Sequence, residues 1–511
     1  MARVFIISNR VAVPDPERGI HAGGLEVALK ATLRRHDCVW LGWSGEVKPA
    51  GETQTRTVVA GGVTYIVTDL SEEDYEEYYN GFANRVLWPI LHYRLDLAEF
   101  TRRDLTGYLR VNDHFASELD KVLEPDDLVW VHDYHLLPLA KALRQRGRHN
   151  RIGFFLHIPM PPPEILTAMP NHERLVPALL HYDLVGFQTD GDAQNFARYL
   201  ASECGMPAHI PRRIGVEDRT MRVGVFPVGI EAREFTRRAR RAVRSDFVQD
   251  VRASTPGALM LGVDRLDYTK GIGLRLDAYE RFLMANRSWH DNVTFAQIAP
   301  KSRSAIHEYA QMEREIDTAA GRINATYGSV SWTPLRYTNR PYTRTALAGL
   351  YRLARVGIVT PLRDGMNLVA KEYVAAQDPE DPGVLILSRF VGAAAEFDHA
   401  LIVNPYDPEA VGAAMCRALE MPLDERIDRH HKLYQALLDN DIRHWGDRFL
   451  TALTGYEMSG AAKRAANRSP ADDGHGAWEG GAVPSLSRQP ARASSLRWSV
   501  AAVPLEQSPT R

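Results

Sequence analysis

The sequence predicts an α/β protein with two doubly wound domains, each a mostly parallel β-sheet with helices on both faces. Short apolar runs rich in β-branched residues recur along the chain, each followed by turn residues and then a helical pattern. This alternation is typical of parallel α/β sheets. The chain has 511 residues, too many for one ordinary core, and its strand-like runs are too numerous for one sheet of usual size.

The first predicted domain, residues 1–235, contains five clear strand-like runs. Each is short and apolar and ends in turn or polar residues, as a buried strand does before its loop. The runs are VFIISNR (4–10), DLVWVHDYH (127–135), RIGFFLHIPMPPPE (151–164), DLVGFQTDGD (183–192) and MRVGVFPVGIE (221–231). A charged segment after Ile230 is the expected crossing into the second domain.

The second predicted domain, residues 236–440, repeats the pattern. Its runs are ALMLGVDRLDYTKG (258–271), VTFAQIAPKSR (293–303), GIVTPLRDGMN (357–367) and VLILSRFVGAAAE (384–396). A helical pattern over about 441–457 closes the folded part, and we expect it to pack back on the first domain. Residues 460–511 are rich in Ser, Pro, Ala, Gly and Arg without an apolar period, which predicts a disordered tail.

Composition and charge exclude several classes of protein. A net charge of -2 gives no footprint for nucleic acid or for an anionic membrane surface. The three cysteines, Cys38, Cys204 and Cys416, are far apart and outside any CxxC pattern, which favours a reducing compartment. The first apolar run is too short for a signal peptide, and no run approaches the ~18 apolar residues of a membrane span. We therefore expect a cytoplasmic protein.

The stretch RDGMNLVAKEYVAAQ (363–377) follows an apolar strand and opens into a helix. A loop at this position lies at the carboxyl end of a parallel sheet, where the helix N-terminus favours a phosphate. Asp364 in the loop and Glu372 in the helix would accept hydrogen bonds from hydroxyls. Two such acceptors beside a helix end that favours phosphate suit a sugar nucleotide. The alternative is an acid favoured by the helix dipole plus a solvated helix face. Lys371, one of few lysines here, lies in the same segment.

DRLDYTKG (264–271) places Arg265 and Lys270 near the end of another strand, with Gly271 at the turn into a helix. A guanidinium and an ammonium group together can neutralise a diphosphate leaving group without a metal. The alternative is an ion pair between Arg265 and Asp264 or Asp267.

The first domain offers further candidates at its strand ends. Arg10 ends the first strand, and Gly24 lies at the entry to the first helix, where backbone can approach a ligand or simply turn. Asp133 in HDYH is read as an acceptor toward a substrate hydroxyl, in preference to a metal site made with the histidines around it. His157 is either catalytic or packed and neutral.

Tyr79 and Trp88 lie in EEYYNGFANRVLWPILHYR (76–94), a segment unusually aromatic for a connection between elements. They either frame a sugar face or belong to the core. The DGD at 190–192 is explained by dipole pairing at a helix start after Thr189. The chain has no GxGxxG fingerprint, which disfavours a nicotinamide or flavin enzyme.

Taken together, these motifs resemble the trehalose-6-phosphate synthase family, retaining glycosyltransferases of the GT-B fold with two Rossmann-like domains and the active site in the cleft between them. The resemblance runs from Arg3 to about Tyr456. It is carried by SNR (8–10), GGL (23–25), WLGWSGE (40–46), EYYN (77–80), LWP (87–89), HYR (92–94), HDYHLLP (132–138), GFFLHIP (153–159), DRLDYTKG (264–271), IAPKSR (298–303), SWTPL (331–335) and TPLRDGMNLVAKEYVAAQ (360–377).

The resemblance implies glucose transfer from a nucleoside diphosphate glucose, such as UDP- or ADP-glucose, to glucose 6-phosphate. The product would be α,α-trehalose 6-phosphate, the first step of trehalose biosynthesis. By the family match, the first domain is the acceptor domain and the second the donor domain. The donor residues are Gly24, Arg265, Lys270, Asp364, Leu368 and Glu372, with His157 near the transferred glucose. The acceptor residues are Arg10, Tyr79, Trp88, Asp133 and Arg303.

The catalytic set expected from the resemblance is Arg265, Lys270, His157 and Asp364, with no metal and no cofactor. Family precedent is a front-side substitution in which the leaving diphosphate helps to deprotonate the incoming hydroxyl. A homo-oligomer and a separate trehalose-phosphate phosphatase are also expected. The alternatives are a related transferase with another acceptor and a catalytically silent sugar-phosphate sensor.

Overall fold

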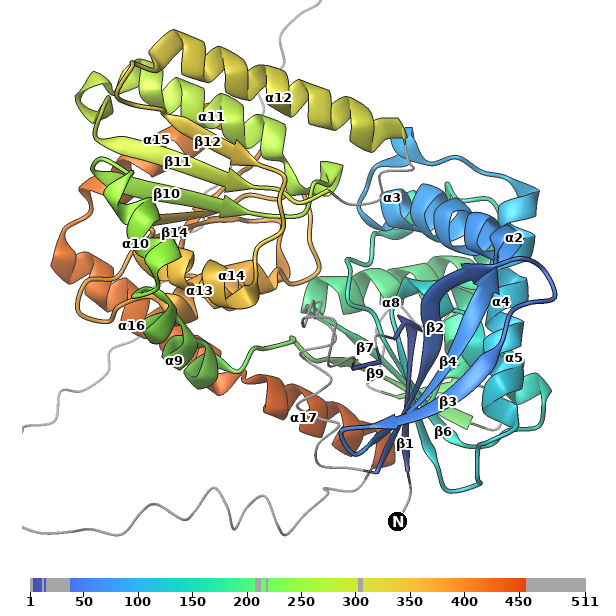
Figure 1. Ribbon diagram of the computed structural model, residues 1–511. Coiled ribbons are helices and arrows are strands. Elements are labelled where there is room, and N and C mark those ends of the chain that lie inside the picture. Colours follow the sequence, from blue (N-terminus) through green and yellow to red (C-terminus); the bar gives the residue numbers. More distant parts are fainter. Residues whose placement is uncertain are drawn as a thin grey trace, which may run out of the picture. The chain divides into compact units, whose positions relative to one another are not determined.

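The computed structural model describes residues 3–11, 13–14, 37–206, 213–216, 219–301 and 307–455. All of them belong to one unit, Met1–Met458. A second unit, Ser459–Arg511, lies outside the described residues, and so does the tail predicted over 460–511. Two sheets organise the described chain, and we call each sheet with its helices the N-lobe and the C-lobe (Figure 1).

The N-lobe sheet has nine strands in the order β3-β4-β2-β1-β5-β6-β7-β9-β8. Neighbours pair in parallel except at the two edges, where β3 with β4 and β8 with β9 are antiparallel. The strands are β1 (Val4–Arg10), β2 (Cys38–Lys48), β3 (Thr55–Ala60), β4 (Val63–Ser71), β5 (Leu128–His132), β6 (Arg151–Phe155), β7 (Leu184–Phe187), β8 (Arg213–Val216) and β9 (Arg219–Val225).

Helices cover the N-lobe sheet on the face to which Phe5 and Ile7 of β1 point, and the alternate residues Val4 and Ile6 point to the other face. The helical segments are α2 (Glu72–Asp74), η1 (Tyr75–Leu87), α3 (Trp88–Leu91), η2 (Leu95–Leu97), α4 (Arg102–Asp120), η3 (Tyr134–Leu136), α5 (Leu139–Gln145), α6 (Pro163–Leu166), α7 (His172–Leu175), η4 (Pro177–His181) and α8 (Asp190–Cys204).

The C-lobe sheet has six parallel strands in the order β12-β11-β10-β13-β14-β15. The strands are β10 (Ala258–Val263), β11 (Val293–Ile298), β12 (Leu335–Thr338), β13 (Val356–Val359), β14 (Val384–Ser388) and β15 (Leu401–Val403). Counted within the lobe, this is the order 3-2-1-4-5-6 of dinucleotide-binding folds.

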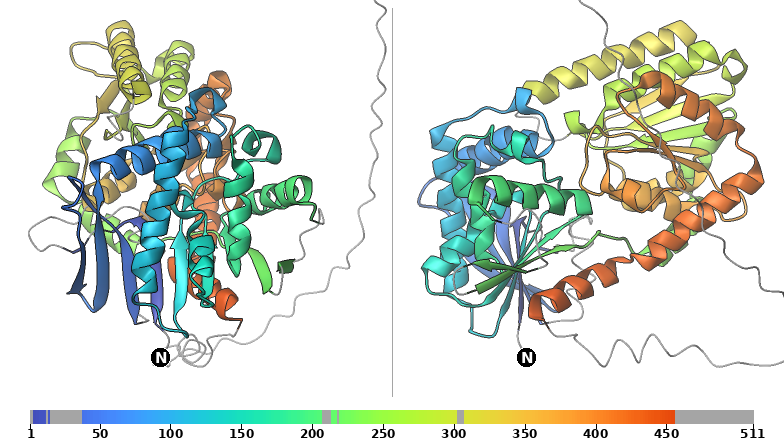
Figure 2. Two further views of the ribbon diagram at one scale, coloured as in Figure 1. Left: turned by 90° about the vertical axis from the view of Figure 1, so that its right-hand side faces the viewer. Right: turned by 180° about the vertical axis from the view of Figure 1, so that it is seen from behind.

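Helices flank the C-lobe sheet on both faces, as the two views in Figure 2 show. One core joins α11, α12 and α15 to the sheet, and another joins α9, α13, α14 and α16. The helical segments are α9 (Ala232–Ala242), α10 (Asp246–Ala253), η5 (Tyr268–Lys270), α11 (Ile272–Ala285), η6 (Arg287–Trp289), α12 (His307–Tyr327), α13 (Arg344–Leu353), α14 (Leu368–Ala376), η7 (Gly392–Ala395), α15 (Pro408–Glu420) and α16 (Leu423–Asp439). The predicted fold class, two parallel-sheet α/β domains, is confirmed.

The last described helix, α17 (Ile442–Thr454), lies against the N-lobe sheet (Figure 1). The ring of Phe449 stacks on Trp130 with 4.5 Å between centroids. Two strand glycines make room for it, because a Cβ added to Gly153 or Gly186 would lie within 2.8 Å of the Phe449 ring. The chain therefore forms the N-lobe first, then the C-lobe, and its last described helix packs on the N-lobe.

The sequence predicted that the aromatic segment 76–94 connects two elements, but most of this segment is helical. A π-helix, η1, spans thirteen residues and continues into α3. Wide turns of this kind are rare and are frequently found at functional sites. Within the described ranges, no helix is both long enough and apolar enough to cross a bilayer.

Candidate active site

Two loops at the switch point of the C-lobe carry three of the six predicted donor residues. β10 and β13 are neighbours in the sheet although β11 and β12 separate them in the chain. In open α/β sheets, ligands bind in the crevice at the carboxyl ends of two such strands. The loop after β10 carries Arg265 and Lys270, and the loop after β13 carries Asp364.

Lys270 and Asp364 form an ion pair across this switch point. Lys270 Nζ donates to Asp364 Oδ2 at 2.5 Å, and Asn367 Nδ2 donates to the same oxygen at 3.0 Å. Burial alone would raise the pKa of Asp364, but the adjacent charge and hydrogen bond of Lys270 hold that pKa below its ordinary value. Asp364 is therefore a fixed carboxylate, suited to accept hydrogen bonds from sugar hydroxyls.

Asn367 also shapes the helix that follows. Its backbone is left-handed, with φ 71°, and its side chain accepts a hydrogen bond from the Ala370 amide at 3.0 Å. Asn tolerates this conformation better than most residues and is a preferred N-cap. The other amide groups in the first turn of α14, which begins at Leu368, have no partners within the helix, and such a helix N-terminus favours phosphate.

Glu372 lies one turn further along α14, and its carboxylate pairs with Arg344 at the start of α13. Arg344 Nε donates to Glu372 Oε1 at 3.1 Å. Burial raises the pKa of Glu372, and Arg344 only partly offsets this effect. The first turn of α14 contains no acid, and Glu372 is half-buried. The alternative of a dipole-favoured acid on a solvated helix face is therefore wrong.

Arg265 is exposed and lies against the N-lobe. Its guanidinium carbon is 5.7 Å from the centroid of the Trp88 ring. Neither ion pair considered for Arg265 occurs among the described residues: Asp264 pairs with Arg275 at 2.7 Å, and Asp267 caps the turn by accepting from the Thr269 amide at 3.0 Å. Arg265 thus keeps its charge available in the crevice.

The N-lobe presents Arg10 and Asp133 at its own switch point, because β1 and β5 are neighbours and these residues stand at their carboxyl ends. Asp133 has φ 75°, an uncommon conformation for a residue with a side chain. Its Oδ1 accepts from the His157 amide at 3.3 Å. Strained backbone of this kind often marks a functional position.

Arg10 and Tyr79 share one neighbour, Trp43 of β2. The Arg10 guanidinium carbon is 5.6 Å from the Trp43 ring, and the Tyr79 and Trp43 rings are 5.4 Å apart. Trp43 was not among the predicted site residues, although it lies within the WLGWSGE motif. It holds together two side chains that come from distant parts of the chain.

Trp88 belongs to the N-lobe core, with 5% of its surface exposed. Its ring packs on His92 at 4.0 Å and on Tyr134 at 5.8 Å. Tyr79 is only half-buried. Of the two predicted aromatic residues, Tyr79 is therefore better placed to contact a ligand through its ring, while Trp88 contacts Arg265.

His157 stands where the two lobes meet. Its Nε2 lies 3.1 Å from His132 Nδ1. Burial lowers the pKa of His157 to about 3, so the imidazole is neutral near pH 7. A Cβ added to Gly365, beside Asp364, would lie 1.9 Å from the His157 carbonyl oxygen. Only glycine allows the two loops to approach so closely.

Comparison with known proteins identifies the family to which this chain belongs. The model of glycosyltransferase family 20 matches residues 15–455. This chain belongs to glycosyltransferase family 20. A trehalose-6-phosphate synthase of Sinorhizobium fredii is 52% identical over 459 residues, which is 89% of this chain and 98% of that protein.

Solved structures of family 20 proteins share the fold. A UDP-forming trehalose-phosphate synthase from Burkholderia xenovorans, in complex with glucose 6-phosphate, is 46% identical, with a TM-score of 0.85 over 88% of this chain and 100% of that one. The Escherichia coli protein bound to UDP-2-fluoroglucose is 44% identical, with a TM-score of 0.84 over 88% and 99% of the two chains. The GT-B fold expected from the sequence is confirmed.

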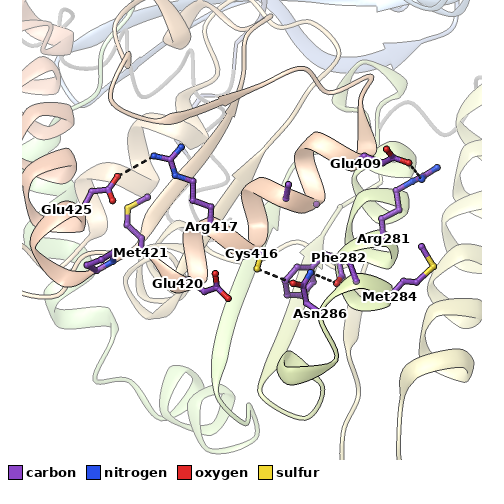
Figure 3. Close-up of a pocket in the computed structure, with 14 residues that line it drawn as sticks. Arg281, Phe282, Met284, Asn286, Glu409, Cys416, Arg417, Glu420, Met421 and Glu425 are labelled. Atoms are coloured by element: carbon purple, nitrogen blue, oxygen red, sulfur yellow. Dashed lines mark hydrogen bonds and ion pairs between the residues drawn. The ribbon is translucent and has the colours of Figure 1, made fainter.

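Two cavities bear on where this family 20 chain binds its ligands. One, of about 420 Å³, has walls from both lobes, including Pro159, Asp192, Arg363, Asp364 and Phe390. The other, of about 680 Å³, lies between α11 and α15 (Figure 3).

None of the predicted site residues lines the larger cavity. Its rim arginines are already paired, Arg281 with Glu409 at 2.8 Å and Arg417 with Glu425 at 3.5 Å (Figure 3). It is therefore less suited to a diphosphate than the crevice between the lobes.

Two predicted site residues of this family 20 chain, Gly24 and Arg303, lie outside the described residues. Across the described ranges, no group of three or more His, Cys, Asp or Glu side chains is arranged to hold a metal ion. His132 is buried beside His157 and Trp130, and Thr189 caps α8 by accepting from the Asp192 amide at 3.2 Å. Asp190 and Asp192 thus lie in the first turn of α8, the place at which the sequence predicts dipole pairing.

Proposed function

We propose that this protein transfers glucose from a nucleoside diphosphate glucose to glucose 6-phosphate, giving α,α-trehalose 6-phosphate with retention. The observation that carries the proposal is the Lys270–Asp364 pair at the switch point of the C-lobe in a family 20 chain. The Sinorhizobium relative is called a trehalose-6-phosphate synthase, and the two similar solved structures contain glucose 6-phosphate or a UDP-glucose analogue.

The donor half of the site combines cations for the diphosphate with acceptors for hydroxyls. Arg265 and Lys270 stabilise the charge that develops on the leaving diphosphate, an effect typically worth several kcal/mol in a water-poor site. Asp364 binds hydroxyls of the transferred glucose, and the start of α14 at Leu368 receives the phosphates. Glu372 binds the ribose, and Gly24 completes this half.

The acceptor half comes mainly from the N-lobe. Arg10 and Arg303 bind the phosphate of glucose 6-phosphate, and Tyr79, Trp88 and Asp133 bind its hydroxyls and ring. The proximity of Arg10 and Tyr79 around Trp43 supports this grouping. The position of Asp133 beside His157 supports a place close to the reacting centre.

We propose a front-side substitution, in which the bond from glucose C1 to the diphosphate breaks while the acceptor hydroxyl attacks from the same face. The leaving diphosphate takes the hydroxyl proton. Asp364 is engaged by Lys270 and Asn367, which favours a binding role over a nucleophilic one. His157 is neutral because burial lowers its pKa. It orients the transferred glucose through a hydrogen bond and brings no positive charge to the site.

The test is an end-point assay of the purified protein with glucose 6-phosphate and, separately, UDP-, ADP- and GDP-glucose, in the presence of EDTA. The sugar product is identified by NMR. Trehalose 6-phosphate formed with EDTA is the expected result, and the ranking of donors gives the base preference. Nucleotide release without this product would contradict the proposed acceptor, and no turnover with any donor would favour a silent sensor.

We further propose a cytoplasmic location, two domains at 1–235 and 236–440 with helix 441–457 assigned to the first, and a homo-oligomer that works with a separate trehalose-phosphate phosphatase. Three free cysteines support a reducing compartment. Sedimentation analysis tests the oligomer.

A further inference from the structure

A short segment of the N-lobe, residues 88–94, contacts both catalytic loops of the C-lobe through three cation–π pairs. Arg265 lies over Trp88 at 5.7 Å, Arg94 over Tyr268 at 5.4 Å, and Arg363 over Tyr93 at 3.8 Å, measured from guanidinium carbon to ring centroid. Arg265 and Tyr268 lie in the loop that carries Lys270, and Arg363 directly precedes Asp364.

The Arg363 pair is the shortest of the three and is built from both lobes. The same guanidinium lies 5.4 Å from the Phe390 ring of the C-lobe, so it is flanked by one ring from each lobe. No carboxylate lies within 4.0 Å of Arg363 in the part of the chain that the structure describes. A planar guanidinium suits such a position because it stacks on aromatic faces, which an ammonium group does less well.

The backbone beside Arg363 connects this stacking to the catalytic pair. The Asp364 amide donates to the Phe390 carbonyl at 3.2 Å, and Asp364 forms a parallel bridge with Val391. Arg363 and Asp364 thus share the 390–391 segment as a support, one through its side chain and the other through its main chain. A shift of the Arg363 side chain would be transmitted to Asp364 and from there to Lys270.

The N-lobe side of the contact is rigid. Tyr93 has φ 65°, which is unfavourable for an aromatic residue. Its amide donates to the Ile90 carbonyl at 3.0 Å. Beneath it, His92 Nδ1 lies 2.8 Å from the Trp88 carbonyl oxygen. The turn after α3 therefore fixes the Tyr93 ring in place, and a strained residue kept in a well-packed turn often serves a function.

We propose that Tyr93 and Arg363 form a latch between the lobes and that Arg363 is a positioning residue that holds Asp364 in place for glucose transfer. This inference rests on the proposed function. With the latch engaged, the lobes exclude water from the crevice, as closure does in many transferases. With it released, water attacks glucose C1 in place of the acceptor hydroxyl, the bond to the diphosphate breaks, and glucose and nucleoside diphosphate are formed.

The test compares the two fates of the donor in single reactions with UDP-glucose and glucose 6-phosphate. Total UDP release is measured enzymatically and trehalose 6-phosphate by NMR. Tyr93→Asn removes the ring but tolerates the left-handed backbone, and Arg363→Met removes the guanidinium at similar length. We expect each to lower the ratio of transfer to hydrolysis about fivefold, the factor that corresponds to one cation–π contact, with donor KM changed by less than about twofold.

Three further variants sharpen the result. Tyr93→Phe keeps the ring and should retain the wild-type ratio, and Arg363→Lys should fall between wild type and Arg363→Met. Arg448 lies on α17, outside the latch, with its guanidinium carbon 5.9 Å from the centroid of the Phe226 ring. Arg448→Met removes this guanidinium and should leave the ratio unchanged. The double variant Tyr93→Asn/Arg363→Met should be no worse than either single variant, because both remove the same contact.

Equal ratios in all variants, or additive losses in the double variant, would overturn the latch. If the wild type makes no trehalose 6-phosphate, the proposed function fails, and the latch is then read by small-angle X-ray scattering. We expect Tyr93→Asn and Arg363→Met to have a larger radius of gyration than the wild type and Arg448→Met, and identical curves would overturn it on their own.

Discussion

Replacing Lys371 by methionine would leave a buried acid without its partner at the point where the chain crosses between the lobes. The Lys371 side chain is 0% exposed and that of Glu396 is 9% exposed, and their charged atoms are 2.8 Å apart. Lys371 Nζ also donates to the Val228 carbonyl at 2.9 Å, and Glu396 Oε2 accepts from Asn440 at 3.0 Å. One side chain of α14 is thus tied to both crossings between the lobes.

The expected cost follows from this burial. Removing one partner of a buried ion pair typically costs 3–5 kcal/mol, because the other charge stays buried and uncompensated. A carbonyl left without its donor adds about 1 kcal/mol. We therefore expect Lys371→Met to lose about 4–6 kcal/mol, or about 8–24 °C in melting temperature if one lobe unfolds as a unit.

The assay is thermal unfolding followed by circular dichroism, with two comparisons. Lys371→Met/Glu396→Gln removes both charges at similar volume and should recover most of the loss. Lys432→Met breaks a surface pair with Asp428, whose side chains are 45% and 59% exposed, and should cost less than about 0.5 kcal/mol. If the double variant melts no higher than Lys371→Met, or if Lys371→Met behaves like Lys432→Met, the reasoning from burial is refuted.

Three further predictions address catalysis, packing and pH. Lys270→Ala should lower kcat by about 10²-fold or more, since one electrostatic contact to the transition state is lost; single-turnover rates close to wild type would contradict its role. Phe449→Ala should cost about 3–5 kcal/mol in urea unfolding, because its 0%-exposed ring fills the space beside Trp130. Burial lowers the pKa of His92 to about 4, so between about pH 6.5 and 4 the unfolded chain binds more protons there than the folded chain, and the contribution of His92 to stability should fall by roughly 2 kcal/mol as the pH drops from 7 to 5. The buried His157, whose pKa is about 3, adds a loss of its own, so His92→Phe should reduce the total slope by the His92 share, and an unchanged slope would exclude that share.

The fold and the loop residues could be predicted because parallel α/β topology depends on local patterns. An apolar run such as 356–360 forms a strand wherever it is buried, and the polar residues after it then stand at the carboxyl edge of the sheet. Arg265, Lys270 and Asp364 needed no knowledge of the partner strands to be placed there. Their proximity followed once β10 and β13 became neighbours.

The contacts that the sequence did not predict are all tertiary. Arg344 pairs with Glu372 from another helix, and Tyr93 meets Arg363 from the other lobe. Lys371 was expected to lie near a binding loop because lysine is scarce in this region, yet it is fully buried and contacts a main-chain carbonyl. No spacing along the chain encodes such pairs. The available signal was weaker: each residue lies next to a motif that was recognised.

The helix α14 couples the proposed donor-binding residues to the segment that joins the two lobes. It is capped by Asn367, which donates to Asp364, and it carries Leu368 and Glu372 on the proposed donor side. Lys371, between them, holds the crossing segment at Val228. A nine-residue helix cannot move one of these groups without the others, since its backbone hydrogen bonds fix their relative positions. A change in the angle between the lobes would therefore shift the carboxylates proposed to bind the donor, so substitutions at the crossing and at the proposed latch should affect the same reaction.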